Sequence, residues 1–122
     1  GICFANLVDF DMLYGHRRNV NGYATALSEF DAWLPSFMEQ MWENDALIIT
    51  ADHGCDPCAA GTDHTREYVP MLIYSKSLMQ GVNLHTRNSF SDIGATVLEL
   101  LGVKSEIDGT SFAPLLYKDG QK

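Results

Sequence analysis

The stretch DALIITADHG, residues 45–54, places an apolar run directly before a polar cluster. A short apolar run with polar flanks is typical of a strand that is buried on both faces of a parallel sheet. A second such run, CFANLVD, occupies residues 3–9, and residues 21–42 repeat apolar side chains at steps of three and four. That spacing forms one face of an amphipathic helix. Strand, helix and strand in this order predict a βαβ unit with parallel strands.

The helix predicted over residues 21–42 contains its own start and break signals. Asn21 is expected to be the N-cap, because an Asn side chain accepts a hydrogen bond from the first helical turn. Pro35 removes one backbone hydrogen bond, so we expect it to kink the helix or to split it in two. The side chains expected to face the core are Ala26, Leu27, Phe30, Leu34, Phe37, Met38 and Met41.

The second half of the chain begins with a polar loop over residues 52–68. The run VPMLIYS at residues 69–75 then predicts a third strand, and residues 82–86 predict a less regular fourth one. Residues 90–101 predict a closing helix that Gly102 ends, because glycine readily adopts the left-handed conformation found after helices. We further expect a cap at Ser89 or Ser91, inward-facing Ile93, Val97, Leu98 and Leu101, and a tail that packs back through Phe112, Leu115 and Leu116.

The order of these elements predicts the α/β class, with helices covering a mostly parallel sheet. The 122 residues are 46% hydrophobic and 20% charged, which suits one domain with a core and excludes a disordered tail. Sixteen acidic and eight basic residues give a net charge of −8, the wrong sign for binding nucleic-acid phosphates. No apolar run approaches the roughly 18 residues that span a bilayer, so we expect no membrane segment.

The cysteines favour a reducing, cytoplasmic setting. Cys3, Cys55 and Cys58 cannot all pair within one chain, which disfavours a disulfide-stapled secreted scaffold. Cys55 and Cys58 form a CxxC pattern, but Asp56 and the acids near it are expected to raise the thiol pKa, which disfavours a redox dithiol. The chain also opens GICF, without an initiator Met and directly in an apolar run, so we expect a fragment of a longer protein.

Polar clusters follow two of the predicted strands, over residues 9–16 and 52–64. In α/β sheets, ligands bind beyond the carboxyl ends of the strands. Three histidines in these clusters, His16, His53 and His64, each have a carboxylate close by in the sequence. Imidazole and carboxylate together are a ligand set for Zn²⁺, Mn²⁺ or Fe²⁺. The sequence therefore predicts a metal site at this edge of the sheet.

Which carboxylates take part is less certain from spacing. Asp11 and His16 are five residues apart, and no regular helix places such a pair on one face, so we expect them to converge across a loop. Asp9, Asp56 and Asp63 remain open as ligands, and Asp63 could instead orient a ligand histidine.

Three arginines flank the histidine clusters: Arg17, Arg18 and Arg66. A guanidinium group can bind a phosphate with two parallel hydrogen bonds. Solvated loop arginines are at least as good an interpretation, so these residues are weak candidates for substrate binding. None of the nearby hydroxyl groups has the setting of an activated nucleophile.

Six stretches resemble the phosphopentomutase family of the alkaline-phosphatase superfamily. They are NLVDFD (6–11), YGHRR (14–18), ITADHG (49–54), GTDHTRE (61–67), VP (69–70) and DIGAT (92–96). ADHG alone indicates only the superfamily, because cofactor-independent phosphoglycerate mutases carry a related motif. The combination of DFDxxYGHRR with GTDHTREYVP is much more specific. The resemblance runs from end to end and corresponds to about the last third of the family's chain.

The resemblance implies two Mn²⁺ ions, with Asp52 and His53 binding one, and Asp11, His16 and His64 binding the other. It implies an isomerase of nucleoside and pentose phosphate metabolism that interconverts ribose or deoxyribose 1-phosphate and the 5-phosphate. In this family a phosphorylated threonine passes phosphate to the sugar monophosphate and takes it back from the resulting bisphosphate intermediate. In physical terms this is two-metal catalysis, with cations about 3.5–4 Å apart that neutralise the transferring phosphoryl group.

The same resemblance implies that residues 1–122 are the C-terminal part of an alkaline-phosphatase-like α/β/α core. The nucleophilic threonine, a further metal-binding aspartate and the cap domain belong to the N-terminal part of the family's chain and have no counterpart in these residues. Two divalent sites need roughly eight ligands or more, and five are present, so we expect no activity from these residues without the N-terminal remainder. Cys55 and Cys58 stand where residues such as Asn and Thr are expected in relatives.

Two other classes of function stay open on the sequence. The first is another enzyme of the superfamily, a phosphohydrolase or a phosphoglycerate mutase, with the same metals and a different nucleophile and cap. The second is a non-catalytic metal-binding or redox module built on the CxxC pattern.

Overall fold

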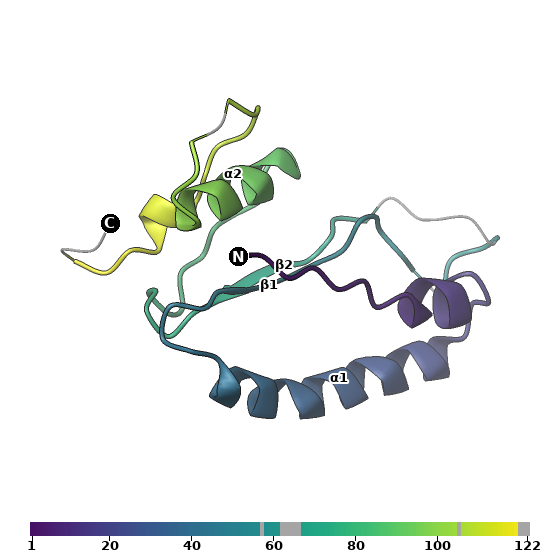
Figure 1. The fold of residues 1–122 in the computed structure, drawn as a ribbon. Coiled ribbons are helices and arrows are strands. Elements are labelled where there is room, and N and C mark those ends of the chain that lie inside the picture. Colours follow the sequence, from purple (N-terminus) through teal and green to yellow (C-terminus); the bar gives the residue numbers. More distant parts are fainter. Residues whose placement is uncertain (57, 62–66, 105, 120–122) are drawn as a thin grey trace. The chain divides into compact units, whose positions relative to one another are not determined.

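The computed structural model describes residues 1–56, 58–61, 67–104 and 106–119. Its elements, in chain order, are a short π-helix η1 (Phe10–Gly15), α1 (Val20–Gln40), β1 (Leu47–Thr50), β2 (Met71–Tyr74), α2 (Ser91–Leu100) and a 3-10 helix η2 (Ala113–Leu115) (Figure 1). The chain divides into two compact units. The ligand unit comprises Ile2–Trp42 and Leu47–Ile73, and the tail unit comprises Glu43–Ala46, Tyr74–Lys122 and Gly1.

The sheet within the described part of the chain consists of β1 and β2, which run antiparallel (Figure 1). The hydroxyl of Thr50, at the end of β1, donates a hydrogen bond to the carbonyl of Pro70, just before β2, at 2.8 Å. The strands expected at residues 45–51 and 69–75 are therefore confirmed, with shorter bounds. Their opposed directions differ from the predicted mostly parallel sheet, and the fold is a mixture of helix and strand.

Two predicted strands are not formed. Residues 3–7 are irregular, with the Phe4 side chain 88% exposed, and residues 82–86 are irregular as well. A strand needs a neighbouring backbone to satisfy its N–H and C=O groups. No described backbone pairs with either segment, which is why apolar composition alone did not make them strands. The predicted βαβ unit accordingly lacks its first strand.

Helix α1 confirms the long predicted helix but begins one residue earlier, at Val20, and ends at Gln40. Its N-cap is Asn19, whose side-chain oxygen accepts a hydrogen bond from the Gly22 N–H at 2.8 Å, so the expected cap at Asn21 is wrong. Pro35 does not split the helix, which stays continuous to Gln40. Near the proline, the hydroxyl of Ser36 donates a hydrogen bond to the Trp33 carbonyl at 2.9 Å.

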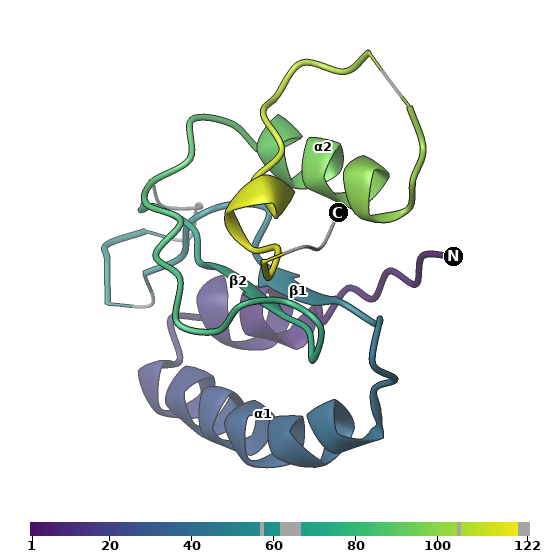
Figure 2. The ribbon, with the colours of Figure 1, turned by 90° about the vertical axis from the view of Figure 1, so that its left-hand side faces the viewer.

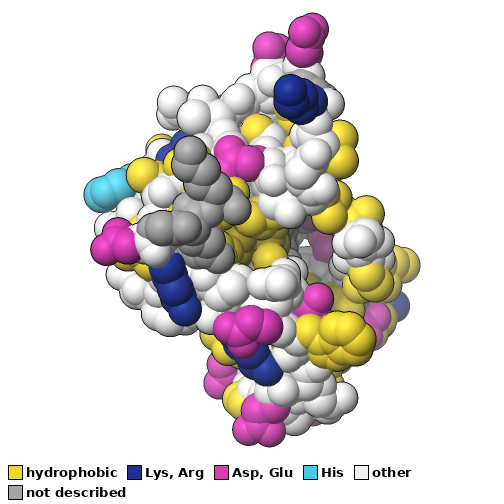
Figure 3. Space-filling model, turned by 60° about the vertical axis from the view of Figure 1, so that its left-hand side comes forward, with side chains coloured by type: hydrophobic (Ala, Val, Ile, Leu, Met, Phe, Trp, Pro, Cys, Tyr) yellow, Lys and Arg dark blue, Asp and Glu magenta, His cyan; other side chains and the backbone are white. Residues whose placement is uncertain are grey.

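The apolar face of α1 is only half covered. Its inward stripe is narrower than predicted and consists of Ala26, Phe30, Leu34 and Met38, which are half-buried, followed by Met41, which is buried. Leu27 and Phe37 were expected to face the core but are exposed. Apolar side chains on the molecular surface are visible in Figure 3, next to acidic ones.

In the tail unit, η2 lies beside α2 (Figure 2). Gly102 ends α2 as predicted: it has a φ of +70°, and the N–H groups of Gly102 and Val103 donate to the carbonyls of Glu99 (3.0 Å) and Leu98 (2.9 Å). This pattern is a Schellman motif. At the other end the N-cap is Phe90, which has no side-chain capping hydrogen bond, so the predicted cap at Ser89 or Ser91 is wrong. The Ser89 hydroxyl accepts a hydrogen bond from the Ser91 N–H at 3.1 Å just before the helix.

The buried face of α2 is polar, which the sequence did not predict. Asp92 and Thr96 are its buried residues, whereas Leu101, expected inside, is exposed. The tail packs back through Phe112 and Leu116, both buried as predicted, whereas Leu115 is 53% exposed.

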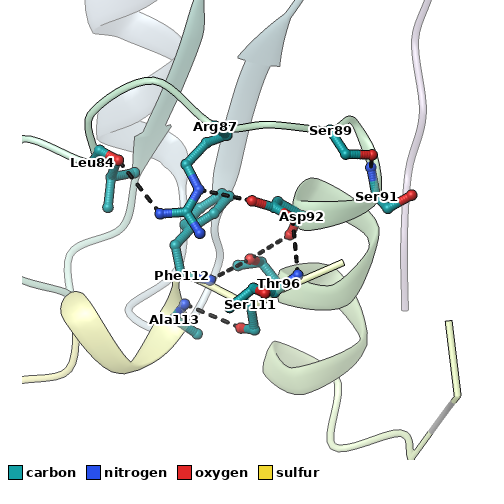
Figure 4. A network of polar contacts seen from close by, with 10 residues as sticks. Leu84, Arg87, Ser89, Ser91, Asp92, Thr96, Ser111, Phe112 and Ala113 are labelled. Atoms are coloured by element: carbon teal, nitrogen blue, oxygen red, sulfur yellow. Dashed lines mark hydrogen bonds and ion pairs between the residues drawn. The ribbon is translucent and has the colours of Figure 1, made fainter. Parts of the chain in front are cut away.

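The polar face of α2 binds the tail directly. The Asp92 carboxylate accepts hydrogen bonds from Arg87 Nε and from the Thr110 N–H, both at 2.9 Å (Figure 4). The Thr96 hydroxyl accepts one from the Phe112 N–H at 2.9 Å. The apolar side of the tail is covered by the Arg87 guanidinium, which lies over the Phe112 ring.

None of the described helices combines the length and the apolar character that a membrane span needs.

Candidate metal centre

Asp11 and His16 lie side by side on the π-helix η1. The His16 N–H donates to the Asp11 carbonyl at 2.9 Å, a hydrogen bond between residues five apart. The wider π-turn therefore brings positions i and i+5 together, and His16 Nε2 lies 3.2 Å from Asp11 Oδ2. We expected this pair to meet across a loop, because an α-helix would separate them. The convergence is confirmed, but the element that produces it is helical.

Gly15 allows close packing in this region because it has no side chain. It is buried, and its backbone is not in the left-handed region, so left-handed backbone freedom is not what this position requires. A Cβ atom at this position would lie 2.9 Å from Cys55 Sγ and 3.0 Å from the Phe10 carbonyl oxygen, which is closer than real Cβ contacts. Gly15 thus allows η1 and the loop after β1 to pack closely. No pattern in the sequence indicated this contact.

Asp52 and His53 follow β1 directly, as predicted. His53 Nε2 lies 3.4 Å from Asp52 Oδ1 and 3.7 Å from Asp11 Oδ1. The other ring nitrogen, Nδ1, is 2.8 Å from the Gly54 carbonyl oxygen. A carbonyl can only accept, so Nδ1 carries the hydrogen, and in the neutral ring Nε2 keeps a lone pair on the side of the carboxylates.

The donor chemistry fits a divalent cation. Oxygen and imidazole ligands about 2.1 Å from an ion in tetrahedral geometry are about 3.4 Å from each other, and the three observed separations are 3.2, 3.4 and 3.7 Å. A backbone carbonyl that fixes a histidine ring is also a common feature of metal sites. However, no group of three or more His, Cys, Asp or Glu side chains among the described residues is arranged to hold an ion. These residues therefore supply paired donors and not a complete coordination shell.

The remaining candidate residues from the sequence are not part of this cluster of described donors. His64, Asp63 and Arg66 lie outside the described residues. Asp9 is exposed, and the Asp56 carboxylate accepts a hydrogen bond from the Cys58 N–H at 2.8 Å, a contact that shapes its own loop.

Of the two arginines in the described part of this region, Arg17 is exposed. Arg18 donates hydrogen bonds to the backbone carbonyls of Asp56 and Gly61. A structural contact of Arg18 was not among the interpretations drawn from the sequence.

Cys55 and Tyr23 lie near the carboxylates. Burial raises the pKa of the Cys55 thiol, and the charge of Asp11 raises it further, while Arg18 acts in the opposite direction. This direction confirms the argument against a reactive dithiol. Burial also raises the pKa of Tyr23, with smaller contributions from Cys55 and Asp11. The Tyr23 ring meets the Phe10 ring edge-on, with centroids 5.6 Å apart, which packs η1 against the start of α1. The sequence did not single out Tyr23.

Comparison with known proteins gives consistent results. The chain is 56% identical over 118 residues to the phosphopentomutase of Clostridium kluyveri, covering 97% of this chain and 30% of that protein. It is 58% identical over 118 residues to that of Symbiobacterium thermophilum, with the same two shares. For the phosphopentomutase of Caldanaerobacter subterraneus subsp. tengcongensis the identity is 59% over 112 residues, covering 92% of this chain and 28% of that protein.

The chain thus spans about 30% of the length of the curated relatives that it matches. A family model described as the metalloenzyme superfamily matches residues 1–105, which include η1, both strands and α2. Paired carboxylate and imidazole donors at 3.2–3.7 Å agree with that assignment. The chain belongs to the metalloenzyme superfamily.

Proposed function

We propose that this chain is the C-terminal, ligand-bearing part of the catalytic core of a phosphopentomutase. The reaction is the interconversion of ribose or deoxyribose 1-phosphate and the 5-phosphate. Identities of 56–59% over at least 92% of the chain support this proposal, because the proteins matched are named phosphopentomutases. Under this proposal, the nucleophilic threonine and the cap domain belong to the remainder of the polypeptide, and the core is alkaline-phosphatase-like and cytoplasmic.

The observation that carries the proposal is the position of the Asp11 carboxylate. One of its oxygens lies 3.2 Å from His16 Nε2 and the other 3.7 Å from His53 Nε2. A carboxylate between two imidazoles suits a site for two cations, because each oxygen has its own nitrogen neighbour. We propose Asp52 and His53 as ligands of one Mn²⁺ ion, and Asp11, His16 and His64 as ligands of the other.

The protein side chains have distinct tasks in this scheme. Bound Mn²⁺ ions would supply the positive charge that neutralises a transferring phosphoryl group. The Gly54 carbonyl holds the His53 ring so that Nε2 faces the carboxylates. Asp11 and His16 are fixed relative to each other by the π-turn of η1. The Asp52 side chain is 87% exposed and is therefore open to groups outside the described residues.

The test uses the complete polypeptide with Mn²⁺ and a sugar bisphosphate activator. Ribose 1-phosphate is added, and the ³¹P NMR spectrum is followed over time. Growth of the ribose 5-phosphate resonance supports the mutase. Release of inorganic phosphate would instead indicate a superfamily phosphohydrolase, and turnover of phosphoglycerate alone would indicate a phosphoglycerate mutase. The 122-residue chain alone serves as the matched control and is expected to be inactive.

A further inference from the structure

Arg18 belongs by its backbone to the turn that carries Asp11 and His16. The Arg18 N–H donates to the Gly15 carbonyl at 3.1 Å, directly after η1. Its φ is +52°, in the left-handed region that is unfavourable for a residue with a side chain. Such a conformation persists where surrounding contacts hold it.

The side chain of Arg18 reaches a loop about forty residues further along the chain. Its Nη1 donates to the Asp56 carbonyl at 2.6 Å, and its Nε donates to the Gly61 carbonyl. The Asp56 carbonyl also accepts a hydrogen bond from the Ala59 N–H at 3.0 Å, so Arg18 and Ala59 share this acceptor. Asp56 follows His53 by three residues.

Arg18 therefore joins the two segments that supply the candidate ligands. The first segment contains Asp11 and His16, and the second contains Asp52 and His53. The guanidinium holds its donors in a rigid planar fork, so Nε and Nη1 bind the two carbonyls at a fixed separation, whereas a lysine ammonium carries its three donors on one freely rotating atom. The same two segments also approach closely at Gly15, where a Cβ atom would lie 2.9 Å from Cys55 Sγ.

We propose that Arg18 is a positioning residue for the metal centre: its fork on the Asp56 and Gly61 carbonyls sets the spacing of the two ligand segments and thereby the affinity for metal. The inference rests on the proposed function, because it presupposes that these segments bind cations. It differs from the sequence interpretation, in which Arg18 was a weak candidate for binding a substrate phosphate.

Whether removal of Arg18 weakens or tightens cation binding distinguishes a positioning role from a purely electrostatic one. Arg18 brings positive charge near the candidate ligands, as its influence on Cys55 shows. If charge alone mattered, removal of Arg18 would tighten cation binding, because one repulsive charge would be gone. If the fork sets the spacing of the ligands, its removal weakens binding.

The experiment measures Mn²⁺ affinity without substrate, in the complete polypeptide. Free Mn²⁺ is quantified by its EPR signal during titration of the wild type, Arg18→Gly and Arg18→Lys. Gly accepts the left-handed backbone, so Arg18→Gly removes the fork without adding strain. We expect about 10-fold weaker binding for both variants, since the loss of groups that orient ligands typically costs 10- to 100-fold. Arg17→Lys is the matched control, with expected affinity within about 2-fold of the wild type.

Two further measurements separate a positioning role of Arg18 from a general loss of stability. Millimolar guanidinium added to Arg18→Gly should restore part of the Mn²⁺ affinity, which a globally destabilised variant would not show. If Arg18→Gly fails to fold, Arg18→Lys carries the comparison alone. Wild-type affinity in Arg18→Lys or tighter binding in Arg18→Gly overturns the positioning role. Unchanged Mn²⁺ affinity with a raised KM for ribose 1-phosphate would assign Arg18 to the substrate instead. A wild type that binds no Mn²⁺ would overturn the proposed function as well.

Discussion

Asp11 Oδ2 and His16 Nε2 lie 3.2 Å apart on one turn of a π-helix. In an α-helix, residues five apart point to different sides, because each turn contains 3.6 residues. The π-turn, closed by the hydrogen bond from the His16 N–H to the Asp11 carbonyl, brings the two side chains together. Single π-turns occur frequently at functional sites, and here the turn is what pairs the carboxylate with the imidazole.

The first prediction concerns Asp11 and metal-dependent stability. The complete polypeptide should melt at a higher temperature in saturating Mn²⁺, by the equivalent of about 2.7 kcal/mol when the ion is at 100 times its Kd. Asp11→Asn should lose most of this increase, because an amide is a weaker cation ligand than a carboxylate. Thermal denaturation with and without Mn²⁺ measures both. Asp9→Asn, an exposed neighbour, should keep the full increase, and an equal loss in both variants would argue against a specific role of Asp11.

Gly15→Ala tests the close packing of η1 against the loop after β1. The new Cβ would meet Cys55 Sγ at 2.9 Å and the Phe10 carbonyl at 3.0 Å, so we expect a destabilisation of about 1–3 kcal/mol. Cys55→Ala in the same chain removes one of the two collisions and should recover part of the loss. Urea denaturation of the wild type, the two single variants and the double variant gives the coupling free energy between positions 15 and 55. Strict additivity would show that the two residues do not contact each other.

The start of α1 can be tested with two asparagines. Asn19→Ala removes the side chain that accepts from the Gly22 N–H and should cost about 1 kcal/mol. Asn21→Ala lies within the helix and should be neutral or slightly stabilising, because alanine has the higher helix propensity. Hydrogen exchange at the Gly22 amide should be faster in the first variant only. A larger loss of stability in Asn21→Ala than in Asn19→Ala would indicate that Asn21 is the N-cap.

Thr96 is expected to stabilise the tail through its hydroxyl. Thr96→Val keeps the shape but leaves the Phe112 N–H buried without an acceptor, at a cost of about 1–3 kcal/mol. Thr96→Ser keeps the hydrogen bond from the Phe112 N–H and the one that the hydroxyl donates to the Asp92 carbonyl at 2.8 Å. It loses one methyl group, at a cost of about 0.8 kcal/mol. Hydrogen exchange at the Phe112 amide reports the difference. Equal exchange rates in the two variants would assign the effect to packing.

Asp92 predicts a pH dependence of the same region. The hydrogen bond from the Thr110 N–H, followed by the contact with Arg87, lowers the pKa of the Asp92 carboxyl below its ordinary value of 3.8. A lowered folded-state pKa means that the stabilisation is complete above pH 3.8 and is lost as the pH falls through the folded-state value. Asp92→Asn should therefore expose the Thr110 amide to faster exchange at pH 7, and the difference from wild type should shrink below about pH 4. The exposed Asp108, changed to Asn, should show neither effect.

Local signals in the sequence were sufficient for several elements. The apolar runs before Asp52 and after Tyr68 gave β1 and β2, and the 3.6-residue periodicity gave α1 and α2. Gly102 marked the end of α2, because its left-handed conformation is a property of glycine itself. These features depend on residues that are neighbours in the sequence.

The predictions that were wrong concern features that depend on contacts with residues far away in the sequence. Residues 3–9 were expected to be a strand, but no described backbone pairs with them in a sheet. The direction of β2 against β1 depends on how the connecting loop returns, which no residue pattern encodes. The buried face of α2 was expected to be apolar, but Asp92 and Thr96 are buried because Thr110 and Phe112 come back to bind them.

The sequence by itself determined the chemical nature of the site, since the donor types and the family resemblance are both properties of the residue order. Only the tertiary structure decided how the donors meet. Asp11 and His16 pair through a π-turn, and His53 joins Asp11 from 42 positions away. Arg18 and Gly15 hold these segments together through contacts that are long-range in sequence. Such contacts depend on loop closure and packing, and residue periodicity carries no information about either.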